Sequence, residues 1–135
     1  MPAPKKPQKL IKNMDLRNHV ESIGCICRNE KCWGVVKCHH VKSVGSGGKD
    51  EFNLIPLCQE HHTSGIHTTT NDRFERLHGL SCVKSLAIVF TVSHLGTEIA
   101  VDELALMRGI DRESAESIIL NAIENIEKGT KSWVG

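Results

Sequence analysis

Apolar residues recur at helical spacing along the last third of the 135-residue chain. A stripe after Asp111 predicts a helix with one apolar face and an aspartate as its N-terminal cap. The stripe consists of Ala115, Ile118, Ile119, Ala122, Ile123 and Ile126. Residues 81–95, which Gly96 would end, and residues 102–108 are predicted as two further helices. The pattern therefore predicts a helical C-terminal region, in which the stripe forms core or a dimer seam.

Shorter apolar runs between turn-forming residues mark the region before it. Valines on both sides of Cys38-His39-His40 favour a strand. Residues 52–57 predict a second strand, with Pro56 at its end or on a sheet edge. Three glycines in residues 44–48 predict a loop between the two strands, because glycine-rich segments lose too much entropy in regular structure.

Helices are predicted on both sides of these strands. Residues 58–62 would begin a helix that is broken or reset at Gly65, and residues 67–78 predict another with Gly79 as its C-terminal cap. Residues 14–23 fit either a short helix or an extended entry segment. The order of elements predicts an α+β fold.

Charge is unevenly distributed, although the formal net charge of the chain is only +1. Five bases oppose one acid in residues 1–20, whereas eight acids oppose five bases in residues 81–135. A basic arm can hold a polyanionic backbone, and the alternative is a solvated terminus. We expect residues 1–13 to form a flexible basic arm.

Thiols are concentrated in one region, since five of the six cysteines lie between residues 25 and 58. The first ten residues lack the apolar core of a signal peptide, and the longest apolar run, residues 86–90, is too short to span a bilayer. Clustered thiols in such a chain favour metal ligands over disulfides. The expectation is a cytoplasmic protein that does not enter a membrane.

Most of the reactive side chains lie in residues 38–67. Two adjacent pairs, His39–His40 and His61–His62, accompany His67 and Cys58 around a single Asn53. Imidazoles and thiols bind divalent ions, a neutral imidazole can take a proton near neutral pH, and a carboxamide can fix an imidazole's tautomer. The order strand, loop, strand, helix, with metal-ligand residues where the elements connect, therefore predicts a ββα-metal core.

The order of these residues resembles the signature of HNH (His-Me finger) nucleases. His40 and Asn53 lie 13 positions apart, and Asn53 and His62 lie nine apart. The resemblance is closest to phage recombination-enhancement (Ref-like) HNH nucleases and covers about residues 14–80. It rests on the thiol-rich turn of residues 25–32, on His39-His40-Val41, on Gly47-Gly48-Lys49-Asp50 and on Pro56-Leu57-Cys58-x2-His61-His62.

The resemblance implies a catalytic ion and a general base. His40 would be the base, and Asn53 would orient it by accepting the other ring N–H. His39, His62 and His67 would hold Mg²⁺ or another divalent ion. His62 and His67 are five positions apart around a glycine, so His67 joins the site only if a new helix begins after that glycine.

The resemblance also implies a structural zinc ion. Cys58 and His61 would close a tetrahedral site with two upstream thiols, of which Cys27 and Cys32 are the first choice. The related pattern has Cys-x2-Cys in this turn, whereas this chain has Cys-x-Cys and then Cys32. Cys25 and Cys38 therefore remain alternatives, and Cys38 can instead pack behind the strand.

The function implied is a metal-dependent DNA endonuclease or nickase, active in phage or prophage recombination or DNA processing. Lys49 and Asp50 would contact substrate phosphate or brace the loop. Residues 14–80 would form the treble-clef-like nuclease core and residues 81–135 a helical extension. Expected partners are DNA, a second copy of the chain through the C-terminal helices and a recombinase, in the host cytoplasm.

Two other functions compete with the nuclease. One is a zinc-stabilised, non-catalytic nucleic-acid-binding module, in which the helices around residues 102–126 have helix-turn-helix proportions. Acidic residues Glu113 and Glu116 would then face phosphates, which argues against groove reading. The other is a phage accessory protein whose zinc is purely architectural.

Overall fold

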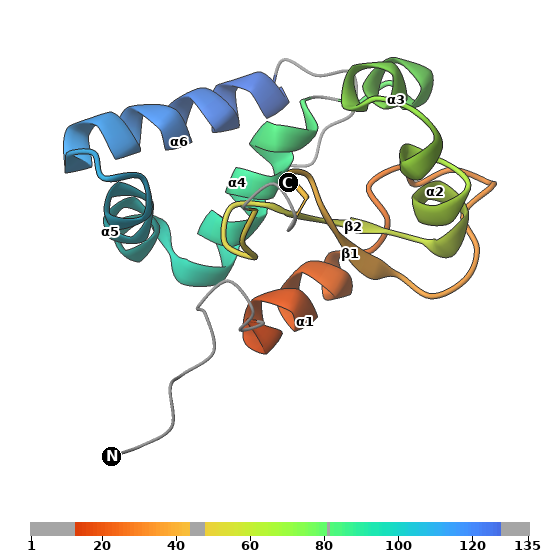
Figure 1. The fold of residues 1–135 in the computed structure, drawn as a ribbon, viewed down its shortest axis with the longest axis horizontal. Helices are drawn as coiled ribbons and strands as arrows, with labels where there is room; N and C mark the ends of the chain where they lie inside the picture. The colour runs from red at the N-terminus through yellow and green to blue at the C-terminus, as the bar shows by residue number, and fades with distance from the viewer. Residues whose placement is uncertain (1–12, 44–47, 81, 128–135) are drawn as a thin grey trace.

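A two-stranded antiparallel sheet lies at the centre of the computed structural model, which describes residues 13–43, 48–80 and 82–127 (Figure 1). Strand β1 (Lys37–His40) pairs with β2 (Leu54–Leu57), so that Cys38 lies opposite Pro56 and His39 opposite Ile55. Successive side chains of a strand point to opposite faces. His39 and His40 therefore meet different surroundings. Residues 1–12 of the predicted arm lie outside the described residues.

Helices surround this sheet. They are α1 (Met14–Ile23), α2 (Gln59–Thr63), the 3₁₀ turn η3 (Ile66–Thr68), α3 (Asn71–His78), α4 (Val83–Leu95), α5 (Thr97–Arg108) and α6 (Arg112–Glu127). In Figure 1, α5 and α6 lie on one side of the molecule and α2 and α3 on the other. The α+β class is confirmed, with most regular structure helical. Within the described ranges, no single helix is long and apolar enough to cross a bilayer, although α3 and α4 meet both criteria as a pair bent by 83°.

Several helix ends lie where the sequence predicts them. The Oδ1 atom of Asp111 accepts a hydrogen bond from the N–H of Ser114 at 3.0 Å, which caps the start of α6. Gly79 ends α3 with a φ of 60°, a left-handed conformation that glycine adopts without steric penalty. Gly96 follows the last residue of α4. These ends depend only on residues within one turn, so the local sequence is sufficient to predict them.

Three predicted boundaries differ from the structure. Strand β2 begins two residues late, because Phe52 turns the chain with a φ of 60° and donates its N–H to Thr91 Oγ1 at 2.8 Å. The helix predicted over residues 67–78 divides into η3 and α3, since the Thr70 side chain caps a new helix. Helix α5 begins five residues early, at Thr97, directly after the glycine that ends α4.

The buried core has two parts that share helix α4. The first part unites α1, the sheet and one face of α4, and the second unites α5, α6, Phe52 and Ile88 of α4. Val89 packs against both parts. The predicted boundary between residues 80 and 81 therefore does not separate independent cores, and the helical region is built onto the motif region.

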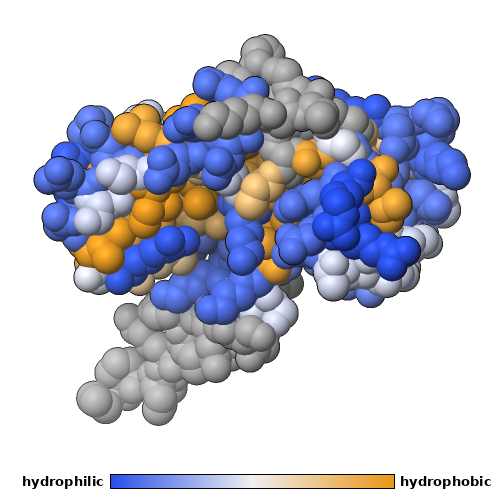
Figure 2. All heavy atoms as spheres, turned by 90° about the horizontal axis from the view of Figure 1, so that it is seen from above, coloured by the Kyte–Doolittle hydropathy of each residue, from blue (hydrophilic) through white to orange (hydrophobic). Residues whose placement is uncertain are grey.

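Helix α6 directs its apolar stripe inward. Its buried residues are Ala115, Ile119, Ala122 and Ile126. This part of the stripe is core within the chain, which explains the helical spacing without a partner. Large apolar side chains are also exposed on α5 and α6, among them Leu106 at 80% and Leu120 at 55%. Figure 2 shows apolar patches among hydrophilic side chains on one face of the molecule. A homodimer through these helices stays a prediction.

Candidate metal centres

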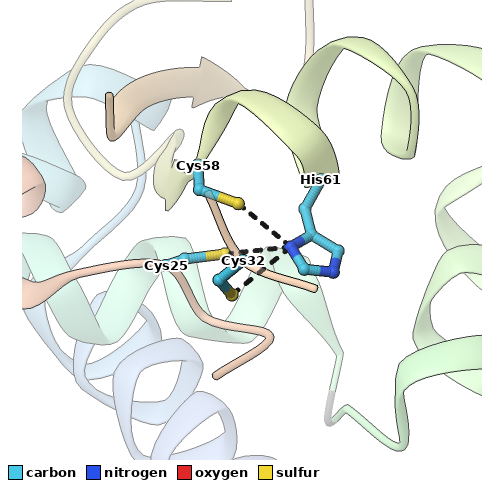
Figure 3. A group of neighbouring side chains, drawn as sticks. All are labelled: Cys25, Cys32, Cys58 and His61. Carbon is cyan, nitrogen blue, oxygen red and sulfur yellow. Dashed lines mark hydrogen bonds between the residues drawn. The ribbon is translucent and has the colours of Figure 1, made fainter. Parts of the chain in front are cut away.

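Four ligand-type side chains converge where the turn after α1 meets the start of α2 (Figure 3). Cys58 precedes the first residue of α2, His61 lies within it, and Cys25 and Cys32 come from the turn. The sulfur atoms of Cys25, Cys32 and Cys58 lie 3.6, 3.5 and 3.1 Å from the Nδ1 atom of His61. Three of the residues are buried and Cys32 is half-buried.

This arrangement suits a tetrahedral metal ion better than a hydrogen-bond network. The Nδ1 atom of an imidazole offers one hydrogen or one lone pair, so it cannot satisfy three sulfur atoms. Tetrahedral zinc, with bonds of about 2.3 Å to sulfur and about 2.0–2.1 Å to nitrogen, separates these atoms by about 3.6 Å. The four side chains therefore fit a metal such as zinc, in a closed set of three thiolates and one imidazole.

Cys25, rather than the first choice Cys27, completes this group with Cys32. The path of the turn explains the difference. The N–H of Ile26 donates to the carbonyl of Pro56 at 3.1 Å, which holds the turn against β2. In this position the Cys25 sulfur reaches α2, while Cys27 lies outside the four-residue group.

One thiolate is favoured in this group by its hydrogen bonds. The hydrogen bond from the Cys27 side chain lowers the pKa of Cys25 to about 4, helped by the Cys58 backbone and opposed by burial. Burial, with a contribution from the negative charge of Cys25, raises the pKa of Cys32 to about 11. A bound dication removes this repulsion, because metal binding and thiol deprotonation are coupled.

Two other thiols lie nearby in different surroundings. Cys27 joins His61 and His78 in a three-residue group that shares the same imidazole and has one donor fewer. Cys38 donates its S–H to the carbonyl of Arg17 at 3.4 Å, and burial raises the pKa of this thiol to about 12. Cys38 is thus a neutral thiol packed between β1 and α1, as the alternative for it predicted.

A second group consists of three imidazoles and is more open. It contains His39 of β1, His62 of α2 and His67 of η3. The Nε2 atoms of His62 and His67 lie 2.9 Å apart, and the ring of His39 is 5.1 Å from each of the other two. His67 is exposed and the others are half-buried. The structure thus brings together the three histidines expected to hold a catalytic ion.

The break at Gly65 makes this group possible. Helix α2 ends at Thr63, and η3 begins at Ile66, so the two histidines do not need to share one helix face. A Cβ atom on Gly65 would lie 2.4 Å from the carbonyl oxygen of His61, which no side chain tolerates. Glycine therefore allows the chain to return close to α2 and to present His67 beside it.

The electrostatics of this group favour neutral imidazoles. Burial, followed by the charges of His62 and His67, lowers the pKa of His39 to about 4. Burial and His67 also lower the pKa of His62. Neutral imidazoles carry the lone pairs that metals need. An all-imidazole set suits zinc, nickel, copper or iron better than Mg²⁺, which prefers oxygen ligands. The expected Mg²⁺ therefore fits these side chains less well than a transition metal does.

His40 follows His39 directly but belongs to a different network. Its Nε2 atom lies 2.8 Å from Oδ1 of the buried Asp50. Arg17 of α1 donates to both oxygens of this carboxylate at 2.7 and 2.9 Å, and the N–H of Asn13 donates to it at 2.9 Å. Burial opposes the charge on Asp50, but hydrogen bonds from Arg17 and His40 lower its pKa to about 2. Since the ionised carboxylate only accepts, Nε2 of His40 carries the hydrogen of this bond, and in the neutral ring the lone pair is on Nδ1.

Asn53 does not orient His40, contrary to the expectation. Its Oδ1 accepts from the N–H of Lys42 at 2.7 Å, and its Nδ2 donates to the carbonyls of Lys42 and Lys49, both at 2.8 Å. Both amide hydrogens are therefore used on the loop backbone. Asp50, which is predicted to contact substrate phosphate or to brace the loop, is buried and bonds to His40 in place of Asn53, while the Lys49 side chain is exposed.

Two residues of the His40 network were not found from the sequence. Asn13, the last residue of the predicted arm, is the N-terminal cap of α1. Asn13 and Arg17 lie 37 and 33 positions from Asp50 in the chain. No local pattern connects positions so distant, and only the packing of α1 beside the sheet reveals the contact.

No family model, curated protein or solved structure matches the chain. The resemblance to HNH nucleases thus rests on the motif residues of the sequence alone.

Proposed function

We propose that the chain is a metal-dependent DNA endonuclease or nickase of the HNH type, acting in phage recombination or DNA processing. The strongest support comes from two consecutive residues of β1. His39 lies in the three-imidazole group, and His40 is paired with an ionised Asp50. Phosphodiester hydrolysis requires a group that can bind a metal and, beside it, a base of fixed tautomer.

His40 acts as the general base in this proposal. Its Nδ1 lone pair takes the proton of the attacking water, while Asp50 holds the Nε2 hydrogen. The imidazolium that forms is stabilised by the carboxylate 2.8 Å away, and Arg17 keeps that carboxylate ionised and in position. A positioned base contributes about 10²–10⁴-fold to the rate.

Two sets of ligands divide the metal binding. His39, His62 and His67 would hold a divalent ion, which supplies stabilisation of the negative charge that develops on the phosphate and the leaving oxygen. The buried group around His61 would hold structural zinc and fix α2 against the turn after α1. The adjacent residues His61 and His62 would thus serve the fold and the reaction respectively.

A zinc-stabilised nucleic-acid-binding module without catalysis is the second candidate. The closed set of three thiols and one imidazole favours it, because such sites are typical of zinc that only holds a scaffold. This candidate gives no role to the three-imidazole group or to the ion pair that fixes His40. The nuclease accounts for both.

Plasmid nicking by the purified protein, with Mn²⁺, Co²⁺, Ni²⁺, Zn²⁺ and Mg²⁺ in turn, tests the proposal. We expect nicking with a transition metal, weaker nicking with Mg²⁺, and a loss of about 10²–10⁴-fold in the His40→Ala variant. His19→Ala is the matched control, because His19 contacts Ser93 and His94 away from both groups. Absence of nicking with every ion, or equal nicking by His40→Ala, would refute the proposal.

A further inference from the structure

A pocket of about 580 Å³ opens between the segment that follows β1 and helices α4 and α5. Its wall combines residues of the loop after β1 with residues of α4 and the end of α5. Four basic side chains line it: Lys42, Lys49, Lys84 and Arg108. All four are exposed, so they can turn toward a ligand in the pocket.

Among the described residues, one acid and no ion pair oppose the charge of the four basic side chains. Glu51 is the only acid among the residues that line it, and its carboxylate accepts a hydrogen bond from the Asn13 side chain at 2.7 Å. Within the described residues, none of the four basic side chains forms an ion pair. Arg112 on α6 differs, because it pairs with Glu98 and Asp102. The pocket therefore offers a concentrated positive field to an anion.

The pocket includes residues that are close in the chain to the proposed base and to its partner Asp50. Val41, which directly follows His40, forms part of its wall. Asn53 also lines it and fixes the backbone of Lys42 and Lys49 through three hydrogen bonds of 2.7–2.8 Å. The Asn53 side chain, which does not reach His40, thus fixes the backbone of two of the four basic residues.

The rest of the wall is mixed, with apolar side chains beside Glu51, Asn53 and Asn71. Phe52, Ile88 and Met107 contribute to its apolar part, and the first two are buried. A concave site of this size, with a partly apolar wall and a few charged groups, is suited to a ligand of drug-like or nucleotide size. The convex backbone of a duplex contacts such a rim but does not fill the space.

We propose that this pocket binds an unpaired nucleotide of the substrate strand, with phosphates on the four basic side chains and the base and sugar against the apolar wall. The proposal deepens the proposed nuclease function and rests on it. It gives α4 and α5 a role in substrate binding and makes single-stranded or unpaired DNA the preferred substrate form.

Fluorescence anisotropy tests the pocket, with a labelled single-stranded oligonucleotide and its duplex. The comparison is between His40→Ala, which keeps the strand intact, and His40→Ala with Lys84→Gln and Arg108→Gln. Loss of two phosphate contacts should weaken single-strand binding roughly tenfold at 0.15 M salt and reduce the salt slope by about 1.4. Duplex binding should fall by less than about threefold.

Matched variants separate charge from fold. Lys84→Arg with Arg108→Lys should restore single-strand affinity to within about twofold, because it keeps both charges. Lys37→Gln removes an exposed lysine of β1 that does not line the pocket, and it should leave affinity unchanged.

Three results would overturn the proposal. They are unchanged single-strand affinity in the double glutamine variant, an equal loss for duplex and single strand, and competition by a mononucleotide as strong as by the oligonucleotide. Nicking by the wild-type protein is measured separately. If no ion supports nicking while the binding loss occurs, the catalytic proposal fails and the pocket assignment stands.

Discussion

The two candidate metal groups share helix α2 but differ in composition and surroundings. His61 is buried and meets three sulfur atoms, whereas the next residue, His62, is half-buried and meets two imidazoles. Consecutive helical residues are about 100° apart around the axis, so neighbours face different surroundings. The thiol group lies against the first core, and the imidazole group includes the exposed His67.

The difference in donor number and exposure assigns one group to folding and the other to a reaction. Four donors in a buried group complete a tetrahedral ion and leave no position for substrate. Three donors, one of them exposed, leave a position that solvent or substrate can reach. Changes in the thiol group should therefore act on folding, and changes in the imidazole group should act on activity.

Loss of a thiol ligand should have the largest effect. We expect Cys58→Ala to lose zinc and cooperative unfolding, because structural zinc contributes about 10 kcal/mol or more and a domain is stable by only about 5–15 kcal/mol. Circular dichroism with zinc analysis measures both. Cys38→Ala, which removes a thiol that donates to the Arg17 carbonyl and lies outside the four-residue group, should keep zinc.

The same measurement distinguishes the two upstream thiols. Cys25→Ser should lose zinc, since its sulfur lies 3.6 Å from His61 Nδ1. Cys27→Ser should retain zinc, because Cys27 lies outside the four-residue group. Zinc retained by Cys25→Ser and lost by Cys27→Ser would reverse the assignment.

Loss of an imidazole ligand should act on activity alone. His67→Ala should reduce nicking by about 100-fold or more, because a three-donor site that loses a ligand holds its ion weakly. Its thermal midpoint should stay close to that of the wild type, since His67 is exposed. His94→Ala serves as control, and a large fall in thermal stability of His67→Ala would contradict the comparison.

Asp50→Asn should reduce the stability of the fold modestly and in a way that depends on pH. The folded state holds the pKa of Asp50 at about 2, below its ordinary value of 3.8, so its contribution is complete above pH 3.8 and is lost as the pH falls toward 2. We expect the variant to be less stable by about 1–2 kcal/mol at pH 7. Denaturant titrations should show that the difference in free energy of unfolding between the variant and the wild type narrows below pH 3.8. A difference that is independent of pH would exclude this ion pair as the cause of the lost stability.

The sequence predicts those features that depend on neighbouring residues. The alternation of a strand separates His39 from His40, and a glycine between His62 and His67 allows both to reach one site. Caps such as Gly79 end helices at the predicted places. Each of these rests on geometry within a few residues.

The features that the sequence did not predict depend on contacts between distant segments. Arg17 and Asp50 meet only because α1 packs beside the sheet, so Asn53 was the more obvious partner for His40. The choice between Cys25 and Cys27 depends on how the turn bonds to Pro56. The basic pocket unites three segments whose lysines and arginine are unremarkable in the sequence.

Metal analysis of two neighbouring variants, His61→Ala and His62→Ala, tests the central comparison most directly. Each purified protein is dialysed against a weak chelator, and its zinc content, thermal unfolding and nicking are then measured. We predict that His62→Ala keeps its zinc and unfolds cooperatively but does not nick DNA, whereas His61→Ala loses zinc and does not fold. Zinc loss and unfolding in His62→Ala, or an intact zinc-loaded His61→Ala, would contradict the division of α2 between fold and reaction.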